Sequence, residues 1–104
     1  MDPASAAKTK PALKFESAAD VLASPIRWRM LAELAKGQPL PVVEMARRLH
    51  LPATNISKHA AVLRDCGVIQ RGFGSDYRIA EKYLVPGERA IDLGVALLRL
   101  DHVA

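Results

Sequence analysis

The sequence predicts a mainly α fold with a small β-hairpin, an α+β class, on three observations. Two segments with helical apolar spacing follow one another between Pro41 and Cys66, and only a short turn separates them. Two β-prone segments, 68–71 and 76–80, come next and flank a Gly-rich tip. Half of the 104 residues are hydrophobic but only 5% are aromatic, so the core is expected to be aliphatic. This length predicts a single domain.

The N-terminal third predicts a tail and two helices. Residues 1–14 are rich in Ala, Lys and Pro and lack periodicity, which is typical of a disordered basic tail. Residues 15–23 predict a short helix whose apolar face consists of Phe15, Ala19 and Leu22. Ser24 and Pro25 suit the N-cap and first position of the next helix, and Gly37 suits its end.

The middle of the chain predicts a helix, a tight turn and a second helix. Residues 38–41 are interpreted as a rigid linker, and Pro41 is expected to begin the first helix of the pair. Pro52 suits the first position of the second helix, and Gly67 suits its end. The buried stripe of the second helix is Ile56, Ala60 and Leu63. Followed by a hairpin, this order is that of a winged helix-turn-helix, which we expect over residues 15–82.

Residues 83–104 form an apolar C-terminal segment whose secondary structure the sequence leaves open. Its apolar residues alternate as in a strand, its composition equally suits a helix, and Gly94 weakens both assignments. We expect the segment to be buried and to serve as a dimerisation element. The alternating residues are Ile91, Leu93, Val95 and Leu97.

Short polar and cationic side chains crowd the first turns of the predicted recognition helix, 52–66, opposite its apolar stripe. They are Thr54, Asn55, Ser57 and Lys58. Asn can pair with adenine, Lys can reach guanine or phosphate, and Thr and Ser can serve either. The segment from Leu40 to Ala80 contains six basic and three acidic residues. This excess, together with the net charge of +4 of the whole chain, favours a polyanionic partner. We therefore expect this helix and the wing, 68–80, to bind double-stranded DNA, although the same residues also suit helix capping and solvent exposure.

Four further side chains are candidate DNA contacts: His59, Arg64, Arg71 and Arg48. His59 is expected to be partly buried and hydrogen-bonded to backbone or phosphate, rather than to bind metal. Arg64 has a surface ion pair with Asp65 as its alternative. Phe73 at the hairpin tip suits either a sugar or minor-groove contact or packing on a neighbouring helix.

The stretches ADVLASPIRWRMLAEL and LPATNISKHAAVLRDCGVIQRG resemble the ArsR/SmtB-type winged-helix transcriptional regulators. The resemblance is carried by Pro25-Ile26-Arg27 and by Ser57-Lys58-His59 through Gly67-Val68. It implies a homodimeric repressor that reads an inverted repeat with one recognition helix per half-site. Metal-sensing members often carry Cys-x-Cys where this chain has Val42-Val43-Glu44-Met45, and Asp92, Asp101 and His102 do not share a helical face. No metal and no cofactor are expected.

Other classes of function find little support in the sequence. The chain lacks a nucleophile elbow, a phosphate loop and metal-ligand spacing, so we do not expect an enzyme. No apolar run approaches the length of a membrane span and no secretory signal begins the chain, which favours a cytoplasmic protein. The single Cys66 is interpreted as a small buried hydrophobe rather than a redox switch. The alternative function is a protein-interaction module on a winged-helix scaffold that does not bind DNA.

Overall fold

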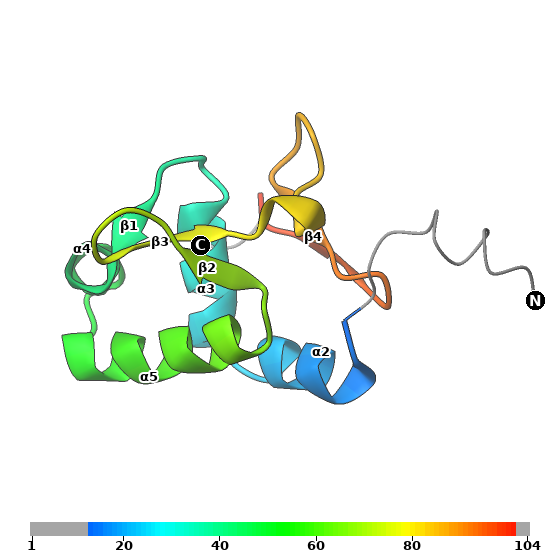
Figure 1. Ribbon diagram of the computed structural model, residues 1–104. Helices are drawn as coiled ribbons and strands as arrows, with labels where there is room; N and C mark the ends of the chain where they lie inside the picture. Colours follow the sequence, from blue (N-terminus) through cyan, green and yellow to red (C-terminus); the bar gives the residue numbers. More distant parts are fainter. Residues whose placement is uncertain (1–12, 102–104) are drawn as a thin grey trace, which may run out of the picture.

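The computed structural model describes residues 13–101 and has the expected α+β winged-helix architecture (Figure 1). Four helices precede most of the strands: α2 (Phe15–Leu22), α3 (Pro25–Leu34), α4 (Val42–Leu49) and α5 (Ala53–Asp65). The strands are β1 (Leu40–Pro41), β2 (Ile69–Arg71), β3 (Asp76–Ile79), β4 (Ala90–Asp92) and β5 (Leu97–Arg99), with a 3₁₀ turn at Glu81–Tyr83. In Figure 1, α2 and α5 lie along one edge of the molecule, and α3 rises between them.

The ends of the helices follow the local signals in the sequence, except that α4 and α5 each begin one residue later than predicted, because Pro41 and Pro52 are N-caps. Ser24 caps α3, and its Oγ accepts a hydrogen bond of 3.4 Å from the Arg27 amide. Pro52 is the N-cap of α5 rather than its first residue, so the predicted start was wrong by one position. At the other end, Gly67 has a φ of 82°, and its amide donates to the Arg64 carbonyl. The Val68 amide donates to the Leu63 carbonyl, which completes a Schellman motif.

The wing, formed by β2, β3 and loop 72–75, belongs to a three-stranded antiparallel sheet in the order β1-β3-β2. Leu40 of β1 pairs with Tyr77 of β3, so part of the predicted linker 38–41 is a strand. Two residues are too few for an alternating pattern, which explains why the sequence did not reveal β1. The pairing attaches the wing to the start of α4, because Pro41 is both the last residue of β1 and the N-cap of that helix.

The buried face of α2 differs from the predicted one. Ala18 and Val21 are buried, whereas Phe15 is 74% exposed, and Ala19 and Leu22 are exposed as well. Apolar residues lie on more than one side of this short helix, so spacing alone does not select the inward face. The small side chains therefore pack against the core and leave Phe15 outside.

Residues 90–99 fold into a β-hairpin, here called the C-terminal hairpin, in which β4 and β5 pair with Ile91 opposite Leu98. The turn is closed by the Leu93 amide donating to the Ala96 carbonyl at 2.8 Å. The chain reversal interrupts the alternation, so Leu93 is buried but Val95 and Leu97 are more than half exposed. Burial was thus wrongly predicted for these last two residues.

The core is continuous from the helices into the C-terminal hairpin. Leu98 and Leu100 belong to the same buried cluster as Met30, Met45 and Leu63. Leu13 also joins this cluster, and its amide donates to the Leu93 carbonyl at 2.9 Å. The packed core therefore begins before residue 15, while the tail prediction for residues 1–12 lies outside the described residues. None of the described helices is long and apolar enough to span a membrane.

Candidate nucleic-acid interface

Helix α5 has the two unlike faces that its sequence predicts. Its stripe of Ile56, Ala60 and Leu63 is fully buried. The opposite side of its first turns is exposed and carries the short polar and cationic side chains Thr54, Asn55, Ser57 and Lys58. No side chain caps the start of the helix. Because unpaired amide groups and the helix dipole give a helix N-terminus a partial positive charge, this end is suited to approach an anionic surface.

His59 is half-buried beside these exposed residues and faces α3. The Nε of Arg27 donates a hydrogen bond of 3.1 Å to His59 Nδ1. Burial, and then the nearby charge of Arg27, lower the pKa of His59. The imidazole is therefore neutral near pH 7, with Nδ1 as the acceptor and the proton on Nε2. Nδ1 therefore accepts its hydrogen bond from within the protein. The N–H group at Nε2 is the imidazole donor that an external anion could accept from.

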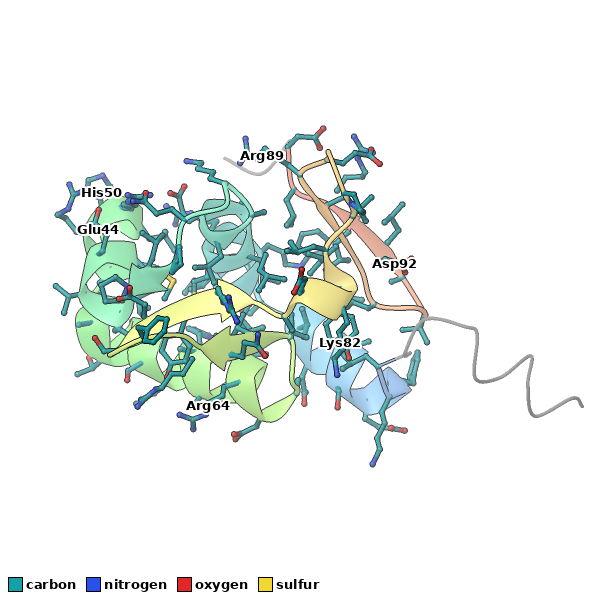
Figure 2. All side chains as sticks on the ribbon, turned by 45° about the horizontal axis from the view of Figure 1, so that its top comes forward. Glu44, His50, Arg64, Lys82, Arg89 and Asp92 are labelled. Atoms are coloured by element: carbon teal, nitrogen blue, oxygen red, sulfur yellow. The ribbon has the colours of Figure 1, made fainter. Side chains whose placement is uncertain are left out.

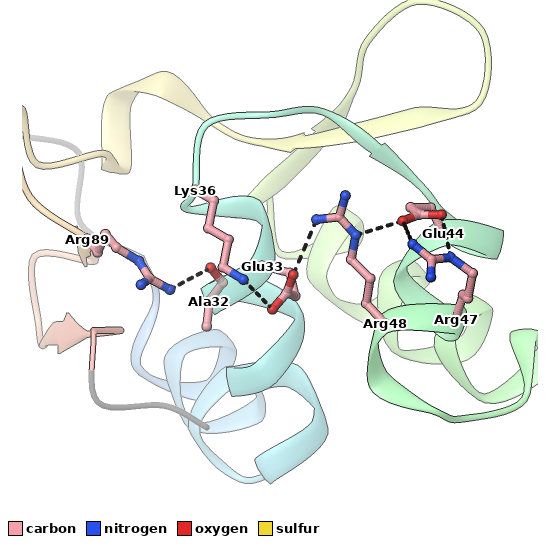
Figure 3. Close-up of polar contacts among 7 residues, drawn as sticks. All are labelled: Ala32, Glu33, Lys36, Glu44, Arg47, Arg48 and Arg89. Carbon is pink, nitrogen blue, oxygen red and sulfur yellow. Dashed lines mark hydrogen bonds and ion pairs between the residues drawn. The ribbon is translucent and has the colours of Figure 1, made fainter.

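Arg48 is held by two carboxylates, those of Glu33 and Glu44 (Figure 3). Its Nε lies 2.7 Å from Glu44 Oε2, and its Nη1 lies 3.3 Å from Glu33 Oε1. Arg47 also bonds Glu44, and the hydrogen bonds from both guanidinium groups lower the pKa of Glu44 to about 2. The two carboxylates thus fix the position of the Arg48 guanidinium and offset part of its charge, because Glu33 also pairs with Lys36 and Glu44 with Arg47. Glu33 comes from α3, so the pair also joins α3 to α4.

Arg64 and Arg71 converge on Tyr77, a residue that the sequence did not single out. Arg71 Nη2 donates to the Tyr77 hydroxyl at 3.4 Å, and its guanidinium carbon lies 5.5 Å from the centre of the tyrosine ring. Hydrogen bonding from Arg71, and to a lesser extent from Arg64, lowers the pKa of Tyr77. The cluster connects the end of α5 to the wing. The sequence predicts a strand at Tyr77. The contact of Tyr77 with Arg71, however, depends on which residues of β2 and β3 lie opposite one another, and the sequence does not define that register.

Arg64 remains accessible despite its contacts. Its Nε lies 3.7 Å from Asp65 Oδ1, but its side chain is 44% exposed, as expected for a weak surface pair. Figure 2 shows Arg64 on the α5 side of the molecule, well away from Arg89 and Asp92. Arg64 and Arg71 therefore add positive charge beside the exposed face of α5.

The structure also shows the surroundings of Phe73 and Cys66, whose contacts the sequence did not decide. Phe73 is 98% exposed at the tip of the wing, so it does not pack on a neighbouring helix of the described chain. Cys66 is half-buried against the core, and its Sγ contacts the Ser17 carbonyl at 3.8 Å, which joins the end of α5 to α2. Within residues 13–101, no three His, Cys, Asp or Glu side chains come together as metal ligands do. His102 lies outside the described residues.

A helix pair, a wing and an exposed polar face on the second helix define the class of winged helix-turn-helix DNA-binding proteins. Residues 24–78, just over half of the chain, match the model of the MarR family. The chain belongs to this family of DNA-binding transcription regulators. The match supports a winged helix-turn-helix regulator but not the more specific ArsR/SmtB-type resemblance. No curated protein and no solved structure matches the chain.

Proposed function

We propose that this regulator is a repressor that binds an inverted-repeat operator as a homodimer, with α5 of each subunit in the major groove. The observation that carries the proposal is the exposed set of polar side chains at the start of α5, directly opposite its buried stripe. Asn55 and Lys58 suit base edges, while Thr54 and Ser57 suit bases or phosphates. The ArsR/SmtB-type resemblance remains an expectation beside this proposal.

The phosphate contacts come from the side chains that surround this face. Arg64 and Arg71 are exposed cations at the junction of α5 and the wing. His59 donates from Nε2 to a phosphate, because its Nδ1 already accepts from Arg27. Arg48 contributes less than these residues, since two carboxylates hold its guanidinium. Its main effect on the recognition helix α5 is indirect. By bonding Glu33, Arg48 holds α4, and with it the turn before α5, against α3.

An exposed apolar surface supports the homodimer. Among the described residues, four of the exposed large hydrophobic side chains gather on α2 and the C-terminal hairpin: Phe15, Leu22, Val95 and Leu97. An apolar groove of about 330 Å³ runs between α2 and the hairpin turn. A second copy covers this surface in the proposed dimer, because a protein that reads an inverted repeat needs two recognition helices related by a two-fold axis. Leu22→Asp is expected to shift the protein to monomers in analytical ultracentrifugation.

The test of DNA reading begins with in vitro selection of bound duplexes by the wild-type protein. The selected consensus should be symmetric, and binding to it should weaken steeply as salt increases. Asn55→Ala combined with Lys58→Ala should lower affinity for the consensus by about 10-fold or more, because it removes both candidate base contacts. Weak binding to unrelated duplexes should persist.

Lys36→Ala is the control for the loss of one exposed positive charge, because Lys36 lies after α3 and pairs with Glu33 rather than facing the exposed side of α5. This variant should keep the preference for the consensus. If the wild-type protein shows no salt-sensitive binding to duplex DNA, the proposal fails, and the interaction-module alternative becomes the better account. If the double variant keeps its operator preference, the assignment of Asn55 and Lys58 is wrong.

A further inference from the structure

Tyr77 is a buried tyrosine in the middle strand of the three-stranded sheet, and its hydroxyl contacts two of the candidate phosphate-binding arginines. The residue is only 4% exposed. In the antiparallel ladder it lies opposite Leu40 of β1 on one side and opposite Arg71 of β2 on the other. Its polar cross-strand neighbour is therefore a cation.

The register of β2 and β3 places Arg71 on the face of the sheet that is turned toward the helices. Ile69 and Ile79 lie opposite one another and are buried on this face. Arg71 follows Ile69 by two residues, so its side chain projects to the same side. β2 lies beside the C-terminal part of α5, whose last turn contains Arg64 (Figure 1). The two arginines therefore approach the tyrosine hydroxyl from different elements.

One hydroxyl group serves both guanidinium groups as an acceptor. Arg71 Nη2 donates to it at 3.4 Å, and the guanidinium carbon of Arg71 lies 5.5 Å from the centre of the tyrosine ring. Hydrogen bonding from Arg64 adds to that from Arg71 in lowering the pKa of Tyr77. A phenolic oxygen has two lone pairs, so it can accept from both arginines at once.

The hydroxyl holds these arginines in a different way from the carboxylates that hold Arg48. A carboxylate offsets part of the charge of the guanidinium that it binds, whereas a tyrosine hydroxyl is a neutral acceptor. Both side chains are also accessible: Arg64 is 44% exposed, with only a weak pair to Asp65, and Arg71 is exposed. An arginine that is already held in place loses less conformational entropy when it binds a phosphate.

We propose that Tyr77 is a positioning residue for phosphate binding, which holds the guanidinium groups of Arg64 and Arg71 together at the junction of α5 and the wing before DNA binds. The inference rests on the proposed function, since that function assigns phosphate contacts to these two arginines. It adds a division of roles. The polar residues at the start of α5 select the sequence, whereas the arginine pair held by the tyrosine adds affinity for any duplex, because phosphates carry no sequence information.

The first test needs no DNA. Nitrogen-15 relaxation measures the mobility of each arginine Nε–H group in the free protein. In Tyr77→Phe, the order parameters of Arg64 and Arg71 should fall, because the ring remains but the shared acceptor is lost. The order parameter of Arg48 should stay the same, since its carboxylates are untouched. Unchanged mobility of both Arg64 and Arg71 would overturn the inference.

The second test measures binding to the selected duplex and to an unrelated duplex. Tyr77→Phe should lower both affinities by a similar factor of about 5, roughly the cost of ordering one long side chain, and should keep the preference for the consensus. Tyr83→Phe is the matched control. It removes the hydroxyl of the other tyrosine, which is equally buried at 4% but lies against Lys82, and it should bind as the wild type does.

A double-mutant cycle separates positioning from a structural role of Tyr77. In a protein that carries both Arg64→Gln and Arg71→Gln, Tyr77→Phe should have no further effect on affinity, because no guanidinium remains to be held. All four proteins are compared at one low salt concentration, at which weakened binding can still be measured. An equal loss in both backgrounds would mean that Tyr77 acts through the fold, which overturns the inference. If the wild type binds no duplex, the proposed function fails and this inference with it; if the wild type binds and Tyr77→Phe binds equally well, only this inference fails.

Discussion

Arg27 Nε donates a hydrogen bond to His59 Nδ1 across 3.1 Å and so connects α3 to α5. The same guanidinium donates through Nη1 to the Asp20 carbonyl on α2. The Arg27 side chain therefore joins three helices. It contacts α5 on the side opposite the DNA-facing residues proposed above, and so helps to fix their position. The bond requires a neutral imidazole, because a protonated Nδ1 cannot accept.

This bond predicts a loss of stability in mild acid. The folded pKa of His59 lies below its ordinary value of 6.5, so the unfolded chain binds the proton first as the pH falls. The contribution of the neutral histidine is fully present above about pH 6.5 and is lost as the pH falls through the lower folded pKa. Urea unfolding should therefore give a smaller free energy of unfolding at about pH 5 than at about pH 7.5.

His59→Asn should reduce this dependence, because an amide oxygen can accept from Arg27 but does not titrate. His50→Asn is the matched control. His50 is exposed after α4 with a φ of 57°, a conformation that asparagine tolerates. Equal acid losses in the wild type and in His59→Asn would contradict this role for His59.

Gly67→Ala should destabilise the protein by about 1 kcal/mol. Gly67 has a φ of 82°, and a Cβ added there would meet no atom within 4 Å, so the cost comes from the backbone conformation alone. Gly72→Ala is the control, because Gly72 has the same open space without a positive φ. Thermal unfolding should separate the two variants; similar stabilities would show that the Schellman turn tolerates a side chain.

Leu100→Ala should cost roughly 2–5 kcal/mol of stability, because Leu100 is fully buried in the main core and its truncation leaves a cavity. Leu97→Ala, three residues earlier on the same hairpin, changes a side chain that is 57% exposed and should cost far less. Denaturant unfolding of the two variants measures how strongly the C-terminal hairpin belongs to the core. A small effect of Leu100→Ala would mean that the hairpin unfolds separately.

Arg48 and Lys58 should differ in their contribution to the salt dependence of operator binding. Lys58→Gln should reduce the slope of log affinity against log salt by up to about 0.9, the value for one phosphate contact on B-DNA, because a cation at a base edge also displaces counterions from the phosphates beside it. Lys58 is exposed on α5, whereas Arg48 is bonded to Glu33 and Glu44. Arg48→Gln should therefore leave the slope nearly unchanged. An equal decrease in both variants would mean that Arg48 leaves its carboxylates to reach the DNA.

The parts of the fold that depend on neighbouring residues could be predicted from the sequence. Ser24 and Gly67 mark the ends of helices through hydrogen bonds to residues only three positions away. The buried stripe of α5 can be predicted from apolar residues that recur with the helical period of 3.6. The polar residues between them must then lie on the other faces of the helix. The exposed half of the candidate interface, from Thr54 to Lys58, was visible for this reason.

Long-range partners could not be predicted in the same way. Arg27 and His59 are 32 residues apart, and Glu33 and Arg48 are 15 apart, so only the packed helices bring them together. For Arg48, the sequence shows the charge but not the two carboxylates that hold it. The face of α2 and strand β1 were missed because short elements are oriented by tertiary packing rather than by their own pattern.

In the proposed dimer, folding and self-association depend on different residues of the C-terminal hairpin. Ile91, Leu93 and Leu98 of the hairpin, and Leu100 directly after it, are buried within a single subunit, so this part of the core does not depend on a partner subunit. Pairing in the proposed dimer then follows mass action among molecules that are already folded. Well below the dissociation constant, the number of paired molecules rises with the square of the protein concentration. At these low concentrations, a twofold change in the amount of the protein would change operator occupancy about fourfold. Repression would therefore respond to the concentration of the protein itself.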